Sequence, residues 1–311
     1  MPALAQVDLR DRVILITGAN SGIGKEAAVT LSTWGATVVM GARSELRGGP
    51  ARAEVQRRSG SGRVELVPLD LGSFDSIHAA ADEVLARHDR LDVLINNAGA
   101  VLSRRAVTRE GFEATLGVNH IGHQLLTDLL LERLTSTAAT VGQPSRVVTV
   151  ASLAHRTGKL RLDDLLFEHR AYNGSVAYAQ SKLANVLFAL ELARRNDPTL
   201  LTSNCLHPGA VRTGFGAAED TNGLERAAMV VGRPFMITPR WGSRPIVYLA
   251  SAPAMQGVTG AYVVGGWPGR SATHKPSHAA RDPRLAAQLW DRTEALIAEG
   301  EARRSGTPPS D

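Results

Sequence analysis

Tyr178 and Lys182 form the pair in this sequence that best suits proton transfer. Their neighbours follow a helical pattern, and helix positions four residues apart lie on one face, one turn apart. A tyrosine hydroxyl ordinarily titrates at about pH 10, and a nearby ammonium group stabilises the phenolate and lowers that pKa. The spacing therefore predicts a general acid/base beside its own cation. The alternative is a pair that occurs by chance on a solvated helix.

Two further polar residues, Ser152 and Asn119, stand where a catalytic site can use them. Ser152 directly follows an apolar strand, residues 147–151, so its hydroxyl is expected at the sheet edge where ligands bind. Asn119 lies within a helical pattern that it does not favour, and an inward amide there needs a partner such as a bound water or a backbone carbonyl. The alternatives are a simple strand cap for Ser152 and a solvated position for Asn119.

A glycine-rich turn, residues 17–24 with the sequence TGANSGIG, follows the first predicted strand and opens the first predicted helix. Glycine lets the backbone turn tightly and approach a pyrophosphate, and the start of a helix offers free N–H groups to the anion. Turns also need glycine for their own geometry, but the strand–turn–helix context favours dinucleotide binding.

The end of the second predicted strand indicates which dinucleotide is preferred. NAD sites usually place an acid here to bind the ribose 2′-hydroxyl, but residues 40–43 contain none. Arg43 stands there instead, and its guanidinium suits the 2′-phosphate of NADP. Lys25, at the start of the first helix, would add positive charge. We expect NADP rather than NAD; the alternative is that both cations are ordinary solvated residues.

The elements that must position these residues alternate along the chain. The predicted strands are residues 13–17, 37–41, 64–69, 93–96, 146–151, 202–206 and 261–264. The predicted helices are residues 22–34, 45–58, 74–87, 111–134, 175–195 and 241–250. Continuous apolar strands indicate burial on both faces, and strand–helix–strand repetition gives right-handed crossovers. We therefore expect one doubly wound, Rossmann-type α/β domain over residues 1–311, with a mostly parallel seven-stranded sheet.

Two irregular stretches, residues 155–173 and 214–239, follow strand ends where ligands bind in such sheets. The second is expected to cover the substrate, and its apolar, methionine-containing sequence suits a bulky apolar substrate, or simply packs on the core. His155 and Arg156 follow Ser152 closely and are expected to be partly solvated loop residues; the alternative is that they face the pocket. The tail after about Glu301 is expected to be flexible.

Composition excludes several classes of protein. The chain has 311 residues, 43% of them hydrophobic, enough for a large core. Its net charge of +5 is spread without a long basic run, so we expect no nucleic-acid partner. The single cysteine, Cys205, fits a reducing compartment, and no metal-ligand spacing occurs. With no signal-peptide pattern and no stretch of roughly 18 apolar residues, we expect a cytoplasmic protein without an integral membrane segment.

In chain order, these residues match the short-chain dehydrogenase/reductase family, which the sequence resembles from about residue 11 to residue 298. The matching motifs are TGANSGIG, Asp70-Leu71, Asn96-Asn97-Ala98-Gly99, Asn119, Ser152, Tyr178-x-x-x-Lys182 and Pro208-Gly209. The sequence also resembles the retinol-dehydrogenase-like branch, which mostly prefers NADP, in TGANSGIGKE at 17–26, VNHIGH at 118–123, SKLANVL at 181–187 and HPG at 207–209. It departs from that branch in lacking a membrane-anchoring N-terminus.

The resemblance implies a role for each matching residue. Tyr178 would be the general acid/base, Lys182 would lower its pKa and hold the nicotinamide ribose, Ser152 would bind the reacting oxygen, and Asn119 would hold a water in the proton relay. Asp70 would meet the adenine, Asn97 the adenine ribose, and Val211 and Thr213 the carboxamide end. The expected cofactor-binding residues are Gly18, Ser21, Gly22, Ile23, Gly24, Arg43, Asp70, Leu71, Asn97, Ala98, Gly99, Tyr178, Lys182, Pro208, Gly209, Val211 and Thr213.

The expected function is therefore an NADP-dependent oxidoreductase that moves a hydride between nicotinamide and the alcohol or carbonyl carbon of an apolar substrate. The main alternative is a non-catalytic NADP-binding redox sensor or scaffold, although a sensor has no need of a proton donor beside nicotinamide. Epimerases, dehydratases and double-bond reductases of the same family are a further alternative. The resemblance also implies a homodimer or homotetramer.

Overall fold

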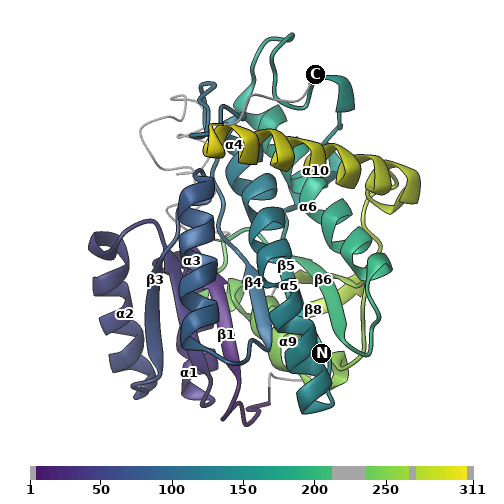
Figure 1. Cartoon of the computed structure of the whole chain (residues 1–311). Helices are drawn as coiled ribbons and strands as arrows, with labels where there is room; N and C mark the ends of the chain where they lie inside the picture. Colours follow the sequence, from purple (N-terminus) through teal and green to yellow (C-terminus); the bar gives the residue numbers. More distant parts are fainter. Residues whose placement is uncertain (1–4, 212–235, 266–270, 307–311) are drawn as a thin grey trace.

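The apolar strands of this chain are buried on both faces of one central sheet, as their continuous sequences predict. The structure, a computed structural model, describes residues 5–211, 236–265 and 271–306. Within them, helices cover both faces of the sheet and form a three-layer α/β/α arrangement (Figure 1). Along β1, Leu15 joins the core on one face, while Ile14 and Ile16 join the core on the other.

The sheet has eight strands in the order β3-β2-β1-β4-β5-β6-β7-β8. They are β1 (Val13–Thr17), β2 (Thr37–Ala42), β3 (Val64–Pro68), β4 (Val93–Asn96), β5 (Ser145–Val150), β6 (Leu201–His207), β7 (Tyr262–Gly265) and β8 (Ser271–His274). The first seven pair in parallel, as predicted, and β8 adds an unpredicted antiparallel edge strand. The order reverses between β1 and β4, which is where ligands bind in doubly wound sheets.

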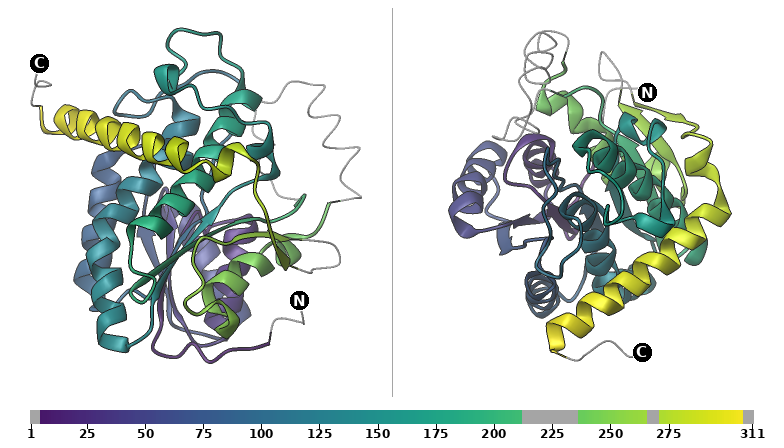
Figure 2. Two further views of the ribbon diagram at one scale, coloured as in Figure 1. Left: turned by 90° about the vertical axis from the view of Figure 1, so that its right-hand side faces the viewer. Right: turned by 90° about the horizontal axis from the view of Figure 1, so that it is seen from above.

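Each face of the sheet has its own helix layer (Figure 2). One layer packs α1 (Gly22–Thr33), α2 (Glu45–Ser59) and α9 (Arg244–Ser251). The other packs α3 (Phe74–Arg87), α5 (Gly122–Val141) and α6 (Gly174–Arg195). The short helical segments are α4 (Ala114–Leu116), η1 (Gly117–Ile121), η2 (Leu153–Arg156), η3 (Leu162–Asp164), α8 (Pro239–Gly242), η5 (Pro253–Met255) and η6 (Ala279–Arg281).

The helix expected over residues 111–134 is divided into three parts. The Glu113 carboxylate caps α4 by accepting hydrogen bonds from the N–H groups of Thr115 and Leu116, at 2.8 Å each. A π-helical turn, η1, follows before α5 begins at Gly122. Such turns are rare and often mark functional positions, and this one carries Asn119.

The C-terminal helix α10 (Pro283–Ser305) was not predicted, and it corrects the expected boundary of the tail. Asp282 caps its first turn by accepting from the N–H groups of Arg284 and Leu285. Trp290 then stacks on Phe188 of α6, with ring centroids 5.7 Å apart. In Figures 1 and 2, α10 lies across the layer that contains α3 and α6. The chain is therefore helical to Ser305.

Within the described ranges, the structure contains no helix that is both long and apolar enough to cross a bilayer.

Candidate active site

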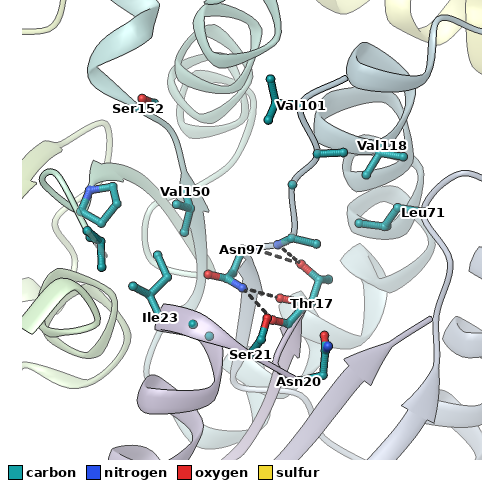
Figure 3. A pocket seen from close by; sticks show the side chains of 18 of the residues that line it. Thr17, Asn20, Ser21, Ile23, Leu71, Asn97, Val101, Val118, Val150 and Ser152 are labelled. Carbon is teal, nitrogen blue, oxygen red and sulfur yellow. Dashed lines mark hydrogen bonds between the residues drawn. The ribbon is translucent and has the colours of Figure 1, made fainter. Parts of the chain in front are cut away.

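A pocket of about 630 Å³ opens at the carboxyl edge of the sheet, where the loops after β1, β2, β3, β4, β5 and β6 meet. Figure 3 shows Ser152 and Val101 at one end of the pocket and Asn20 and Ser21 at the other. The predicted cofactor residues that line it are Gly18, Ser21, Gly22, Ile23, Gly24, Arg43, Asp70, Leu71, Asn97, Ala98, Gly99, Tyr178, Lys182, Pro208, Gly209 and Val211. Thr213 and residues 214–235 of the expected lid lie outside the described residues.

The glycine-rich loop has room only for glycine at two positions. Gly18 has φ +64°, and a Cβ atom added there would lie 2.9 Å from the Ala98 Cα atom. A Cβ atom on Gly24 would lie 2.4 Å from Asn97 Nδ2. Ser21 precedes α1, but its side chain makes no capping hydrogen bond, and the first turn carries no acid. The N-terminus of α1 is therefore free to bind an anion such as a pyrophosphate.

Asn97 joins this loop to the turn that follows β4. Its Nδ2 atom donates to the Thr17 carbonyl at 2.7 Å, and the N–H groups of Asn97 and Ala98 donate to Thr17 Oγ1 at 2.9 Å each (Figure 3). Its Oδ1 atom is buried and accepts no hydrogen bond from the described residues. A sugar hydroxyl would supply the missing donor, so this position suits the ribose of a dinucleotide.

Two arginines line the pocket where the 2′-phosphate of NADP is expected. Arg43 and Arg47 are both exposed, and neither forms an ion pair with another described residue. Arg47, in the first turn of α2, was not singled out from the sequence. Lys25, expected to add charge here, instead pairs with Glu54 at 2.6 Å and is not part of the pocket lining.

The residues predicted to handle the proton lie near the end of the pocket formed by β5 and α6. Tyr178 is hydrogen-bonded to Ser152; burial raises the Tyr178 pKa above its usual value, and this bond lowers it in part. Lys182 is 3% exposed, and its Nζ atom lies 5.6 Å from the Tyr178 ring centroid. Nζ donates to the Val150 carbonyl at 3.2 Å, and burial lowers the Lys182 pKa to about 8. Burial thus outweighs the lowering of the Tyr178 pKa that the sequence suggested.

Asn119 lies behind the pocket wall, fully buried in the π-helical turn. Its Oδ1 atom accepts from the Ala100 N–H at 2.6 Å, while Nδ2 donates to the Ala100 carbonyl and to Ser181 Oγ at 2.9 Å each. The Ser181 hydroxyl in turn donates to the Tyr178 carbonyl at 2.9 Å. Of the two partners considered for this inward amide, the structure supplies a backbone carbonyl. Asn119 thereby ties the turn that carries Tyr178 to the loop after β4.

His155 is fully buried, not partly solvated as the sequence suggested. Its Nδ1 atom lies 2.7 Å from the Ser152 carbonyl, and its Nε2 atom lies 3.2 Å from the Ser277 N–H. Because a carbonyl only accepts and an N–H only donates, the ring carries its proton on Nδ1. His155 therefore anchors the Ser152 turn to the segment after β8. Arg156, by contrast, is exposed.

Comparisons with known proteins agree with this arrangement. The family model described as short chain dehydrogenase matches residues 12–222. Human (Homo sapiens) retinol dehydrogenase 14 is 40% identical over 303 residues, which cover 93% of this chain and 87% of that protein. An uncharacterized protein from Mycobacterium paratuberculosis has a TM-score of 0.74 at 36% identity, covering 93% of this chain and 94% of its own. A third match is a protein from Beutenbergia cavernae that is described as an NAD(P)-dependent gluconate 5-dehydrogenase and was solved with NADP at low occupancy. It has a TM-score of 0.65 at 28% identity, covering 84% of this chain and 97% of its own.

Proposed function

The chain is an oxidoreductase of the short-chain dehydrogenase family, in its retinol-dehydrogenase-like branch, and we propose that it transfers a hydride between NADP and the alcohol or carbonyl carbon of an apolar substrate. The observation that carries this proposal is the Tyr178 hydroxyl, hydrogen-bonded to Ser152 in the pocket, with the buried Lys182 ammonium group one helical turn away. This arrangement holds a proton donor and a second hydroxyl side by side.

In the proposed mechanism, the substrate oxygen accepts hydrogen bonds from the hydroxyls of Ser152 and Tyr178. Bound nicotinamide supplies the hydride in reduction and accepts it in oxidation. Tyr178 gives its proton to the substrate oxygen in reduction and takes one back in oxidation. The Lys182 ammonium group, fixed on the Val150 carbonyl, stabilises the phenolate that forms. Because burial raises the Tyr178 pKa, the phenol stays protonated at neutral pH and is ready to donate.

The cofactor is proposed to bind from the glycine-rich loop to the Tyr178 end of the pocket. The N-terminus of α1 and the loop glycines suit the pyrophosphate, and Asn97 Oδ1 suits a ribose hydroxyl. Asp70 and Leu71 line the proposed adenine end, and Pro208, Gly209 and Val211, with Thr213, are assigned to the nicotinamide end. Arg43 and Arg47 support NADP over NAD, because two guanidinium groups without an ion pair to any described residue attract a 2′-phosphate. The bound NADP of the Beutenbergia cavernae structure is consistent with this choice.

An apolar substrate is proposed from the pocket and from one relative. Val101, Leu102 and Val150 line the pocket with apolar side chains, and Figure 3 places Val101 at the same end as Ser152. Apolar walls with a few directed polar groups are the usual form of a site for a small apolar ligand. The relative named retinol dehydrogenase 14 supports a long apolar alcohol or its aldehyde.

The test is to follow oxidation of NADPH and of NADH by the purified protein with retinal, medium-chain aldehydes, steroid ketones and quinones. Short polar carbonyls such as sugars serve as the matched control. The proposal expects faster NADPH oxidation with the apolar carbonyls than with the control compounds. Tight NADPH binding without turnover on any carbonyl would contradict it and favour a redox sensor.

A further inference from the structure

His123 is a buried histidine that lies between the two halves of the site. It stands one turn after Asn119, in the first turn of α5, and is 1% exposed. Its Nδ1 atom lies 3.0 Å from the Asn119 carbonyl oxygen, and its Nε2 atom lies 2.9 Å from Thr17 Oγ1. One ring therefore spans from the π-helical turn to the residue that ends β1 and begins the glycine-rich loop.

The direction of each hydrogen bond follows from which groups can donate. The Asn119 carbonyl only accepts, so the proton of the neutral ring is on Nδ1 and Nε2 is an acceptor. The Thr17 hydroxyl must then donate to Nε2, and its oxygen accepts from the N–H groups of Asn97 and Ala98. This arrangement satisfies both ring nitrogens and the hydroxyl at once.

The ring is held in its neutral form. Burial lowers the pKa of His123 to about 4; the hydrogen bond to the Asn119 carbonyl opposes this change, and the charge of Lys182 adds to it. Among the described residues, the Thr17 hydroxyl also has the Ile95 carbonyl as an acceptor, but at the longer distance of 3.4 Å. The hydroxyl therefore favours His123.

We propose that His123 is a positioning residue that fixes the catalytic turn and the cofactor loop relative to each other through the two nitrogens of one neutral ring. Its Nδ1 atom donates to the main-chain carbonyl of Asn119, and the side-chain amide of the same residue holds Ser181 and through it the turn that carries Tyr178. Its Nε2 atom accepts from the hydroxyl of Thr17, whose oxygen holds the turn after β4 against the glycine-rich loop. The role rests on the proposed function, because it concerns turnover and cofactor binding.

The two hydrogen bonds of the ring can be tested separately with two conservative variants. The side-chain amide nitrogen of asparagine occupies the place of histidine Nδ1, and the amide of glutamine reaches the place of Nε2. His123→Asn should keep the bond to Asn119 and lose the bond to Thr17, so the Kd for NADPH should rise about tenfold while kcat stays within about threefold. His123→Gln should show the reverse, with kcat lowered about tenfold and the Kd nearly unchanged.

The matched control is His120, which is also buried and lies three residues earlier on the same helical run. Its Nε2 atom bonds Thr293 Oγ1 of α10 at 2.9 Å, away from the pocket. His120→Asn and His120→Gln should lower the free energy of unfolding but leave kcat and the NADPH Kd within about twofold. Thr17→Val should weaken NADPH binding as His123→Asn does, whereas Thr17→Ser, which keeps the hydroxyl, should bind NADPH nearly as wild type does.

Three results decide the proposal. Opposite changes in kcat and Kd for His123→Asn and His123→Gln would support it. If wild type is active and both His123 variants lose only stability, as the His120 variants should, with kcat and Kd unchanged, the role of His123 is overturned and the proposed function stands. A wild type that neither binds NADPH nor turns over would overturn both. Nitrogen-15 NMR at neutral pH adds a readout independent of activity, since a His123 ring protonated on Nε2 would contradict the proposed arrangement.

Discussion

Replacing Lys182 with methionine is expected to stabilise the folded protein while removing its turnover. The Lys182 side chain is 3% exposed, and burial lowers its pKa from 10.5 to about 8. This change corresponds to about 3 kcal/mol of unfavourable free energy for the charged form at about pH 7. The variant loses one hydrogen bond to the Val150 carbonyl, worth about 1 kcal/mol, but that carbonyl keeps the Asn185 side-chain donor at 3.2 Å. The expected net gain is about 2 kcal/mol.

The stability difference between Lys182→Met and wild type is expected to depend on pH in one direction. The folded-state pKa is lower than the unfolded one, so the cost of the charge is fully present below about pH 8 and disappears as the pH rises toward 10.5. Denaturant unfolding without cofactor should therefore show the advantage of Lys182→Met at about pH 7 and a much smaller one at about pH 10. Lys159→Met, at an exposed position, is the matched control and should change stability by less than about 0.5 kcal/mol. A variant less stable than wild type at neutral pH, or an advantage independent of pH, would refute the reasoning.

Two further predictions concern the two ends of the pocket. Arg43→Ala should weaken NADPH binding about tenfold, and the double variant Arg43→Ala/Arg47→Ala up to about a hundredfold, because each change removes a charge-assisted bond of about 1.5 kcal/mol. Fluorescence titration should show unchanged NADH binding for both variants. Arg52→Ala is the control and should change the binding of neither cofactor. Ser152→Ala should lower carbonyl reduction and move the alkaline limb of its pH profile upward, because the hydrogen bond that lowers the Tyr178 pKa is lost; a limb that stays in place would mean that another group titrates there.

The parallel strands could be predicted because burial on both faces leaves a continuous apolar run in the sequence. β1 and β4 begin and end at the predicted residues. The antiparallel strand β8 has the sequence SATH, which carries no such signal, and it forms by pairing with β7. That pairing depends on tertiary structure and cannot be read from a local pattern.

The sequence carries a signal for the helix α10. Asp282 before Pro283 is typical of a helix start, and the buried residues Ala286, Leu289, Trp290, Thr293 and Leu296 follow at helical spacing. The basic residues at its end led to the prediction of a tail from about Glu301, but basic residues also favour the last turn of a helix.

The residues of the proposed site were assigned from their order in the chain, and that order gave no information on their hydrogen bonds. The contact of His155 with Ser277 joins positions 122 residues apart, and only the folded chain brings them together. Whether Arg47 and Lys25 have ion-pair partners likewise cannot be predicted from the order of residues in the chain. The sequence cannot tell that Lys25 pairs with Glu54, whereas Arg47 lines the pocket without an ion pair to any described residue.

The most direct test of the proposed function is the turnover of Tyr178→Phe with an apolar carbonyl and NADPH. The variant removes only the hydroxyl that is hydrogen-bonded to Ser152, so the NADPH Kd should stay within about threefold of wild type. The account predicts that kcat falls at least about a hundredfold, as expected for the loss of a general acid. A kcat within a few fold of wild type, with NADPH still bound, would contradict it.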